Sequence, residues 1–402
     1  MIRFSRKQLR IPYLVFLLVF VVLPLFVILY YALTNGEGQF TWENFREFFV
    51  DGKTMGTLFY SLMIAVTTTI VCLLIAYPTA YILARGNLKR GPVYVILLVM
   101  PMWINFTLRI TAVKEILDVM EGNLAMYPFF NTILCMVYDF LPFMILPLYT
   151  TISKLDDSLP EAAADLGASS FHVFWRVMIP MTLPGIISGV TMVFLPAMTN
   201  YVVLDMIYNS TYIMGSLIGS YFNAYDWHNG SMISILLLIN VLCDMDYGPF
   251  CKEAGSGSKR RWHMVKKLGQ RLWLFCVFVF LYAPILVLIV YSFTSSTMIG
   301  AIRGFSLEHY VTLFTTKELL HMIGGTLLLA VTVAFLSTLL GTIGAIGSFY
   351  AGKKSGQCIN FLNQIPIANA EVVTGFSICV LMIVLFGVDK DTYLPLLVGQ
   401  TV

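Results

Sequence analysis

Long apolar segments constrain this chain more than any other feature of its sequence. Runs of about 20 apolar residues, such as 13–33, recur along the 402 residues, and the charged residues cluster between them. A helix of about 20 apolar residues is long enough to cross the roughly 30 Å hydrocarbon core of a bilayer. Because only 12% of the residues are charged and the mean hydropathy is +0.81, an ordinary soluble domain with about 25% charged residues is excluded. The sequence therefore predicts an all-α fold, a polytopic transmembrane helical bundle.

The positions of Lys and Arg predict the orientation of these segments. The apolar segments fall at 11–33, 57–84, 92–113, 129–152, 181–204, 231–243, 272–293, 324–350 and 358–387, and a further one begins near 393. With a cytoplasmic N-terminus, most Lys and Arg residues lie in cytoplasmic loops, as the positive-inside rule requires. The first segment exceeds the apolar core of a signal peptide, so it is expected to be retained as a helix.

An internal repeat divides the sequence. Phe40, Glu43 and Pro101 recur at one constant offset along the chain, as Phe305, Glu308 and Pro366. Because both copies begin on the same side, the repeat is parallel, and the fold is predicted to contain two tandem parallel copies. The predicted division is a first copy at 1–243 with about six helices, a cytoplasmic linker at 244–270, and a second copy at 271–402. The second copy holds about three and a half helices, so we expect either a continuation or a separate chain that completes it.

The loop between the fourth and fifth apolar segments contains strong local signals for structure. Ser158 and Glu161 have the spacing of a capping box, and Gly167 suits a left-handed helix end. Ser170 is placed to cap a second short helix that ends near Pro180. The loop therefore predicts a rigid two-helix protrusion, suited to a groove on a partner.

This loop resembles a known motif. Glu161-Ala162-Ala163, then Gly167, then Pro180, within residues 154–180, is similar to the EAA loop of type I ABC importer permeases. The resemblance implies the type I ABC importer permease fold and a coupling helix that sits in a cleft of a cytoplasmic ABC ATPase dimer. The coupling residues that it implies are Glu161, Ala162, Ala163, Asp165, Gly167 and Pro180.

Longer stretches resemble spermidine/putrescine permeases. The stretches that carry this resemblance are 98–103, 141–149 and 365–375. The first copy is similar to the B-type subunit and the second, from about Arg261, to the C-type subunit, so the chain resembles a fusion of the two that is truncated before a second EAA loop. The resemblance implies an ATP-driven polyamine importer of the bacterial inner membrane, which works with an extracytoplasmic polyamine-binding protein. A permease for another small solute, such as thiamine or iron, or a secondary transporter, is the alternative.

No enzyme site is found in the sequence. A G-x-x-x-x-G-K-[ST] loop is absent, so ATP is expected to bind a separate subunit and this chain to need no cofactor. The five His residues are too scattered for a metal site, and a net charge of +3 offers no general attraction for nucleic acid. The expected surroundings are membrane lipid and the transport partners.

Ionisable residues within the apolar segments are candidates for the substrate pathway. Such residues are costly in hydrocarbon and usually face a cavity or pair with one another. A polyamine calls for carboxylates together with aromatic faces that attract cations. The candidates are Asp139, Tyr138, Trp103, Tyr201, Asp205 and Glu371.

A structural alternative applies to two of these carboxylates. Asp139 and Glu371 could instead neutralise Arg109, which is the basic residue within the apolar segments. For Arg109 itself, the sequence favours pairing or extension toward Glu115 or Asp118.

Overall fold

The computed structural model describes residues 10–86, 91–122, 124–156, 158–207, 213–245, 267–295, 304–350, 356, 359, 362–363, 371–387 and 393–401. The elements in this part of the chain are helical, apart from two isolated β-bridges, Thr34 with Phe40 and Thr294 with Phe305. The helices, in chain order, are α1 (Arg10–Leu17), η2 (Leu18–Val22), α2 (Leu23–Ala32), α3 (Glu43–Val50), α4 (Gly52–Arg85), α5 (Gly91–Val99), η3 (Met100–Trp103), α6 (Phe106–Glu121), η4 (Leu124–Met126), α7 (Pro128–Lys154), α8 (Ser158–Asp165), α9 (Ser170–Val173), η5 (Phe174–Met178), α10 (Ile179–Thr199), α11 (Tyr201–Ile207), α12 (Met214–Asn223), α13 (Trp227–Met245), α14 (Lys267–Ser292), α15 (Glu308–Thr315), α16 (Lys317–Phe349), α18 (Glu371–Phe386) and α19 (Tyr393–Thr401).

The prediction of an all-helical polytopic membrane protein is confirmed. Six helical stretches of the described residues are long and apolar enough to cross a membrane: Ile11–Ala32, Gly52–Arg85, Pro128–Lys154, Ser170–Thr199, Gly269–Ser292 and Lys317–Phe349. Shorter helices, α13 and α18, lie at the predicted segments 231–243 and 358–387. Parts of the predicted scheme lie outside the described residues, namely most of the linker, 246–266, and much of 351–370.

The segment predicted as one span at 92–113 is bent instead. Gly91–Trp103 and Phe106–Glu121 meet at an angle of 93°. Asn105 lies at the corner, where its side chain accepts a hydrogen bond from the backbone N–H of Thr107 at 2.9 Å and so begins α6 as its N-cap. Hydropathy alone missed this corner because the residues on both sides of it are apolar.

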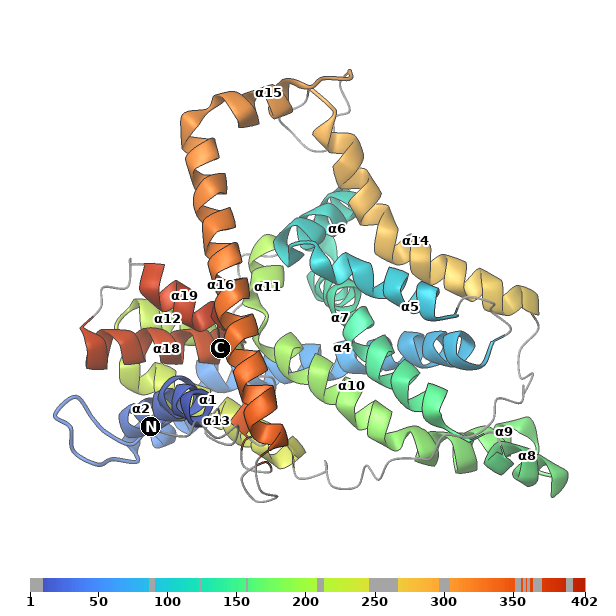
Figure 1. Cartoon of the computed structure of the whole chain (residues 1–402), viewed down its shortest axis with the longest axis horizontal. Coiled ribbons are helices and arrows are strands. Elements are labelled where there is room, and N and C mark those ends of the chain that lie inside the picture. The colour runs from blue at the N-terminus through green and yellow to red at the C-terminus, as the bar shows by residue number, and fades with distance from the viewer. Residues whose placement is uncertain are drawn as a thin grey trace, which may run out of the picture. The chain divides into compact units, whose positions relative to one another are not determined.

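The described chain forms two compact units. Unit 1 comprises Met1–Gly56, Met214–Val241 and Leu307–Val402, and unit 2 comprises Thr57–Ile213 and Leu242–Ser306. In unit 1, α1 packs against α16, and α18 packs against α2 and α12 (Figure 1). Tyr13 makes the first of these contacts beside Gly344, and its hydroxyl donates to Asn363 Oδ1 at 2.8 Å.

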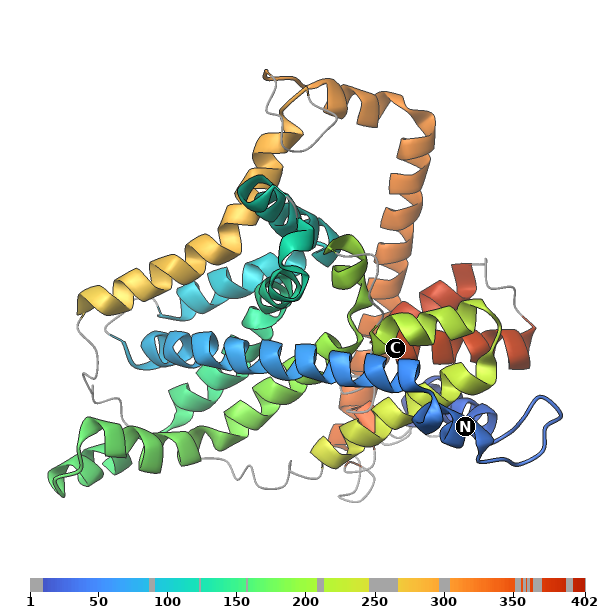
Figure 2. The same cartoon turned by 180° about the vertical axis from the view of Figure 1, so that it is seen from behind.

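Unit 2 is built around α7. The most apolar part of α7 is 72% buried. Helix α7 packs against α10, α5, α6 and α11 (Figures 1 and 2). Two glycines let α10 approach α7 closely. A Cβ atom on Gly185 would lie 2.8 Å from Thr151 Cβ, and one on Gly189 would lie 2.5 Å from Met144 Sδ. At these two positions the backbone of α10 therefore packs against side chains of α7.

The local backbone geometry recurs at the same sequence offset as the repeated residues. Helices α3 and α15, α6 and α18, and the first residues of α7 and α19 are all separated by this offset. The residues before α3 and α15 agree closely, with φ −102° and ψ 5° at Trp42 and φ −103° and ψ 9° at Leu307. Those after them also agree, with φ −72° and ψ 110° at Asp51 and φ −80° and ψ 112° at Thr316. The sequence repeat is thus accompanied by a repeat of local structure.

Replacing Gly185 with Val is expected to destabilise unit 2. The new side chain must displace Thr151 and the backbone of Pro147, and overpacking of this kind costs about 1–3 kcal/mol. Thermal unfolding in detergent micelles measures the loss. The matched control is Gly324→Val in α16, where a Cβ would meet no atom within 4 Å. Equal unfolding temperatures for the two variants would show that α7 and α10 do not depend on this close approach.

Candidate functional site

The predicted protrusion forms a helical hairpin between α7 and α10. Helices α8 and α9 lie at one end of unit 2, beyond the ends of α7 and α10 (Figures 1 and 2). Gly167 ends α8 with a positive φ of 84°, as its sequence context predicted. The backbone N–H of Ala168 donates to Ala163 O at 3.1 Å and that of Gly167 to Ala164 O at 2.8 Å. These two bonds form a Schellman motif, which fixes the direction of the chain after α8.

The caps of the hairpin helices differ from the predicted ones. Helix α8 already includes Ser158, whose backbone N–H donates to Asp156 Oδ1 at 3.0 Å. Helix α9 is capped by Ser169, not Ser170, because the Ser169 hydroxyl accepts from the backbone N–H of His172 at 3.4 Å. Asp and Ser are nearly equivalent N-caps, so a run of such residues leaves the cap ambiguous in the sequence.

The second hairpin helix does not end near Pro180. It continues from α9 through a π-helical turn, η5, into α10, so that Ser170–Thr199 is one helical stretch. Pro180 lies two residues after this π-helical turn, inside the continuous stretch, where it contributes no backbone N–H. The hairpin is therefore joined to α10 without an intervening loop.

The hairpin has buried stems and an exposed apolar tip. Leu155, Val173 and Met178 are buried, whereas Leu166 is 89% exposed and Phe171 69% exposed. Large apolar side chains that project together from a surface mark a site of interaction. Leu159 and Trp175 are also exposed on this hairpin.

The predicted coupling residues occupy the same hairpin. Glu161 and Ala163 are half-buried, whereas Ala162, Asp165, Gly167 and Pro180 are exposed. Five of the six lie on or next to α8, and Pro180 lies farther along, in α10. The structure thus places the motif at the exposed end of a rigid connection between two packed helices.

A buried ion pair joins α6 to α7 in the interior of unit 2. Arg109 Nη2 lies 2.6 Å from Asp139 Oδ1, and both residues are almost fully buried. The predicted pairing of Arg109 with Glu115 or Asp118 is wrong. At about 100° per residue, Glu115 lies about 120° around α6 from Arg109 and Asp118 lies on the opposite face. The counter-ion therefore comes from the neighbouring helix.

The ion pair is incompletely hydrogen-bonded within the described part of the chain. Arg109 Nε and Nη1 are buried and find no hydrogen-bond partner among the described residues. Asn200, at the break between α10 and α11, donates from Nδ2 to Asp139 Oδ2 at 3.5 Å. Sequence reasoning missed Asn200, although an amide between two apolar helices was a usable signal. Asp139 therefore acts here as the partner of Arg109, which was the structural alternative for this residue.

Tyr138, the neighbour of Asp139, contacts a different helix. Its hydroxyl donates to the carbonyl oxygen of Leu281 at 3.2 Å, and its ring meets that of Phe280 edge-on, with centroids 5.7 Å apart. The residue is fully buried, so it links α7 to α14. The structure gives Tyr138 a packing role beside the ion pair.

The other predicted pathway residues are more accessible. Trp103 is 78% exposed and lies at the corner before α6. Tyr201 is half-buried and Asp205 exposed on α11, a helix that contacts both α6 and α7. Glu371 is the first residue of α18, and its side chain lies outside the described residues.

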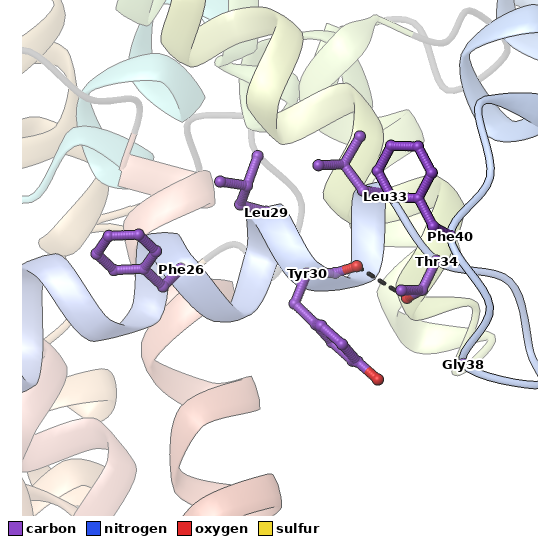
Figure 3. Close-up of a pocket in the computed structure, with 7 residues that line it drawn as sticks. All are labelled: Phe26, Leu29, Tyr30, Leu33, Thr34, Gly38 and Phe40. Carbon is purple, nitrogen blue, oxygen red and sulfur yellow. Dashed lines mark hydrogen bonds between the residues drawn. The ribbon is translucent and has the colours of Figure 1, made fainter.

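An apolar groove lies at the end of α2 in unit 1. It has a volume of about 440 Å³ and is lined by Phe26, Leu29, Tyr30, Leu33, Thr34, Gly38 and Phe40 (Figure 3). The Thr34 hydroxyl donates to the carbonyl oxygen of Tyr30 at 2.8 Å, the dashed line in Figure 3. This lining has no carboxylate, so it offers no counter-charge to an ammonium group. The part of the chain that the structure describes also has no cluster of His, Cys, Asp and Glu suited to a metal.

Replacing Asp139 with Asn is expected to destabilise the protein strongly. The change leaves the Arg109 guanidinium buried without a counter-charge, which costs about 3–5 kcal/mol. The double variant Arg109→Met with Asp139→Leu removes both charges and should recover most of the lost stability in thermal unfolding. If the double variant is as unstable as Asp139→Asn, the pair is not an isolated structural unit. Substrate uptake by the double variant then shows whether the two charges are needed for transport as well as for the stability of the bundle.

The chain is similar to known membrane components of transport systems. Residues 3–244 match the family model of the binding-protein-dependent transport system inner membrane component. The spermidine/putrescine transport system permease protein PotB of Escherichia coli is 37% identical over 246 residues, which cover 56% of this chain and 89% of that protein. PotB of Haemophilus influenzae is 36% identical over 245 residues, covering 56% and 85%. A PotB homologue of Mycoplasma genitalium is 27% identical over 237 residues, covering 55% and 82%.

The family assignment and the membrane-spanning helices agree on the class of protein. The matched region contains the hairpin, the ion pair and the helices that hold them. A membrane component of this kind is not itself an enzyme, because ATP is hydrolysed by a separate subunit. The chain therefore belongs to the binding-protein-dependent transport system inner membrane components, as a multi-pass inner-membrane permease of an ABC import system.

Proposed function

We propose that this chain is the permease of an ATP-driven importer of polyamines, with its N-terminus in the cytoplasm. Its partners are an ABC ATPase dimer on the cytoplasmic side and an extracytoplasmic polyamine-binding protein. The polyamine class is supported by the PotB proteins, which are 36% and 37% identical to this chain over 56% of its length. The observation that carries the proposal is the exposed hairpin with the Glu161-Ala162-Ala163 motif at the junction of α7 and α10.

The packing of the hairpin suits it to transmit force. Its exit stem continues directly into α10, and its entry stem follows Leu155, the extended C-cap residue of α7. Helices α7 and α10 pack closely at Gly185 and Gly189. A partner that grips Leu166 and Phe171 at the tip would move both helices as one body. Alternating access then follows when closure of the ATPase dimer displaces this pair of helices within unit 2.

The tandem arrangement is part of the proposal. The first copy, 1–243, contains the coupling hairpin, and the second copy begins at 271 after the linker. The recurrence of helix starts and cap dihedrals at the offset of the sequence repeat supports this division. It also makes α16 the counterpart of α4, and α18 the counterpart of α6.

The proposed substrate pathway keeps the candidates that the sequence predicts. Trp103, Tyr201, Asp205 and Glu371 are proposed to contact the ammonium groups, through carboxylates or aromatic faces. Tyr138 and Asp139 are proposed to shape the wall of this pathway, because their polar atoms already bind within the bundle. Arg109 is neutralised by Asp139, so it presents less of a barrier to a cation.

Transport by the reconstituted system tests the function. The chain is placed in proteoliposomes with its ATPase and binding protein, and uptake of labelled spermidine and putrescine is measured with and without ATP. ATP-dependent uptake of either polyamine is the expected result. Uptake that needs an ion gradient and no ATPase would identify a secondary transporter, and uptake of thiamine or iron alone would identify a different substrate.

Replacing Gly167 with Val is expected to uncouple the permease from its ATPase. A β-branched residue at φ 84° costs roughly 1–2 kcal/mol, so the Schellman turn opens and the tip changes direction. ATP hydrolysis stimulated by substrate-loaded binding protein should fall about tenfold. Gly167→Asn is the matched control, because Asn tolerates the left-handed conformation and should retain most of the stimulation. Normal stimulation in Gly167→Val would mean that the turn geometry is not needed for coupling.

A further inference from the structure

The exit stem of the hairpin is attached to α4 by one tyrosine. The hydroxyl of Tyr77 lies 3.1 Å from Thr182 Oγ1, and its ring meets that of Phe174 edge-on at a centroid distance of 5.5 Å. The single hydroxyl proton of Thr182 is directed to the carbonyl oxygens of Met178 and Ile179, at 2.8 and 3.1 Å. Tyr77 is therefore the donor in its bond with Thr182.

The entry stem is attached to the same helix by an arginine. Arg85 Nη2 donates to the carbonyl oxygen of Leu155 at 2.5 Å. Leu155 is the buried C-cap of α7, so the guanidinium lies at the C-terminal, negative end of this helix's dipole. A guanidinium at that position satisfies an orphan acceptor and interacts favourably with the dipole.

The two attachments come from the last turns of α4. Tyr77 and Arg85 are eight residues apart, which corresponds to about 12 Å along a helix axis. That separation lets one helix hold both the chain that enters the hairpin and the chain that leaves it. Between them, Tyr81 and Leu83 are buried, so this end of α4 is enclosed by other parts of the protein.

The backbone of the exit stem is weak enough for such an attachment to matter. Residues Phe174–Met178 form a π-helical turn, and Pro180 and Pro184 each lack a backbone N–H donor. Helices bend most readily at π-turns and prolines. Tyr77 contacts the chain on both sides of this segment, through its ring at Phe174 and its hydroxyl at Thr182 in α10, and so constrains the direction of the hairpin relative to α10.

We propose that Tyr77 and Arg85 are positioning residues that fasten the coupling hairpin to α4, so that a displacement of the hairpin moves α4 together with α7 and α10. This inference rests on the proposed function, in which an ATPase acts on the hairpin. It adds α4 to the moving body. The inference also predicts that variants without the Tyr77 and Arg85 contacts still bind the ATPase.

The test uses conservative variants of the complete chain in lipid nanodiscs with its ATPase. Tyr77→Phe and Thr182→Val each remove the same hydrogen bond, and Arg85→Met removes the bond to Leu155. Three quantities are measured: co-purification of the ATPase, ATP hydrolysis with and without substrate-loaded binding protein, and the thermal unfolding midpoint. Tyr282→Phe is the matched control, because it loses a hydroxyl bond to the Leu97 carbonyl, 2.6 Å long, elsewhere in unit 2.

Stimulated hydrolysis is expected to fall about fivefold in Tyr77→Phe, the factor that corresponds to one neutral hydrogen bond. Basal hydrolysis, ATPase co-purification and the unfolding midpoint should match those of Tyr282→Phe. The double variant of Tyr77→Phe with Thr182→Val should be no worse than either single variant, because both remove one shared bond. Thr182→Ser should retain more stimulated hydrolysis than Thr182→Val, and Arg85→Lys more than Arg85→Met, because each conservative variant keeps a hydrogen-bonding group.

Three results overturn the inference in different ways. Wild-type stimulation in both Tyr77→Phe and Arg85→Met, with the ATPase bound, shows that α4 does not need to hold the hairpin. If Tyr282→Phe loses as much stimulation as Tyr77→Phe, and both losses accompany an equal fall in the unfolding midpoint, the cause is a general loss of stability instead. If the wild-type chain does not co-purify with the ATPase at all, the proposed function fails and this inference fails with it.

Discussion

The close packing of α7 on α10 is the contact on which the rest of unit 2 depends. Gly185 and Gly189 remove the side chains that would hold the two helices apart, and Thr151 and Met144 occupy the space. In hydrocarbon there is little hydrophobic drive between helices, so small residues that permit such contact supply much of the association. The hairpin between these helices continues directly into α10. Its direction is then set locally by the Schellman turn at Gly167.

The buried pair of Arg109 and Asp139 imposes the second constraint on this unit. Two charges in a low-dielectric interior must remain together, because separation exposes each to the full cost of desolvation. The pair therefore fixes α6 against α7, and Asn200 extends the contact to the break after α10. An arrangement in which these helices move apart must carry the pair along or replace its partners. Motions of the bundle are thus restricted to those that keep α6 and α7 together.

The sequence predicted much of this structure, and each place where it failed has an identifiable cause. The apolar segments, the left-handed glycine at 167 and the exposed motif around Glu161 depend on residues near one another in the chain, and these predictions agree with the structure. The partner of Arg109 was wrong because the choice between a residue on its own helix and one on another helix needs tertiary information. The corner at Asn105 was missed because apolar residues lie on both sides of it, and the cap at Ser169 because the neighbouring serine offered an equivalent signal. The contacts of Tyr77 and Arg85 with the hairpin had no local signal.

By itself, the sequence determined that this protein is embedded in a membrane, that it is helical, and to which family it belongs. Length and hydropathy of the segments suffice for the first two, because the bilayer thickness and the need to satisfy every backbone hydrogen bond leave few options. Only the tertiary structure decided which polar groups meet: Arg109 with Asp139, Tyr138 with Leu281, and Arg85 with Leu155. The physical reason is that these bonds join residues far apart in the sequence, and the pairing depends on which helix faces pack together.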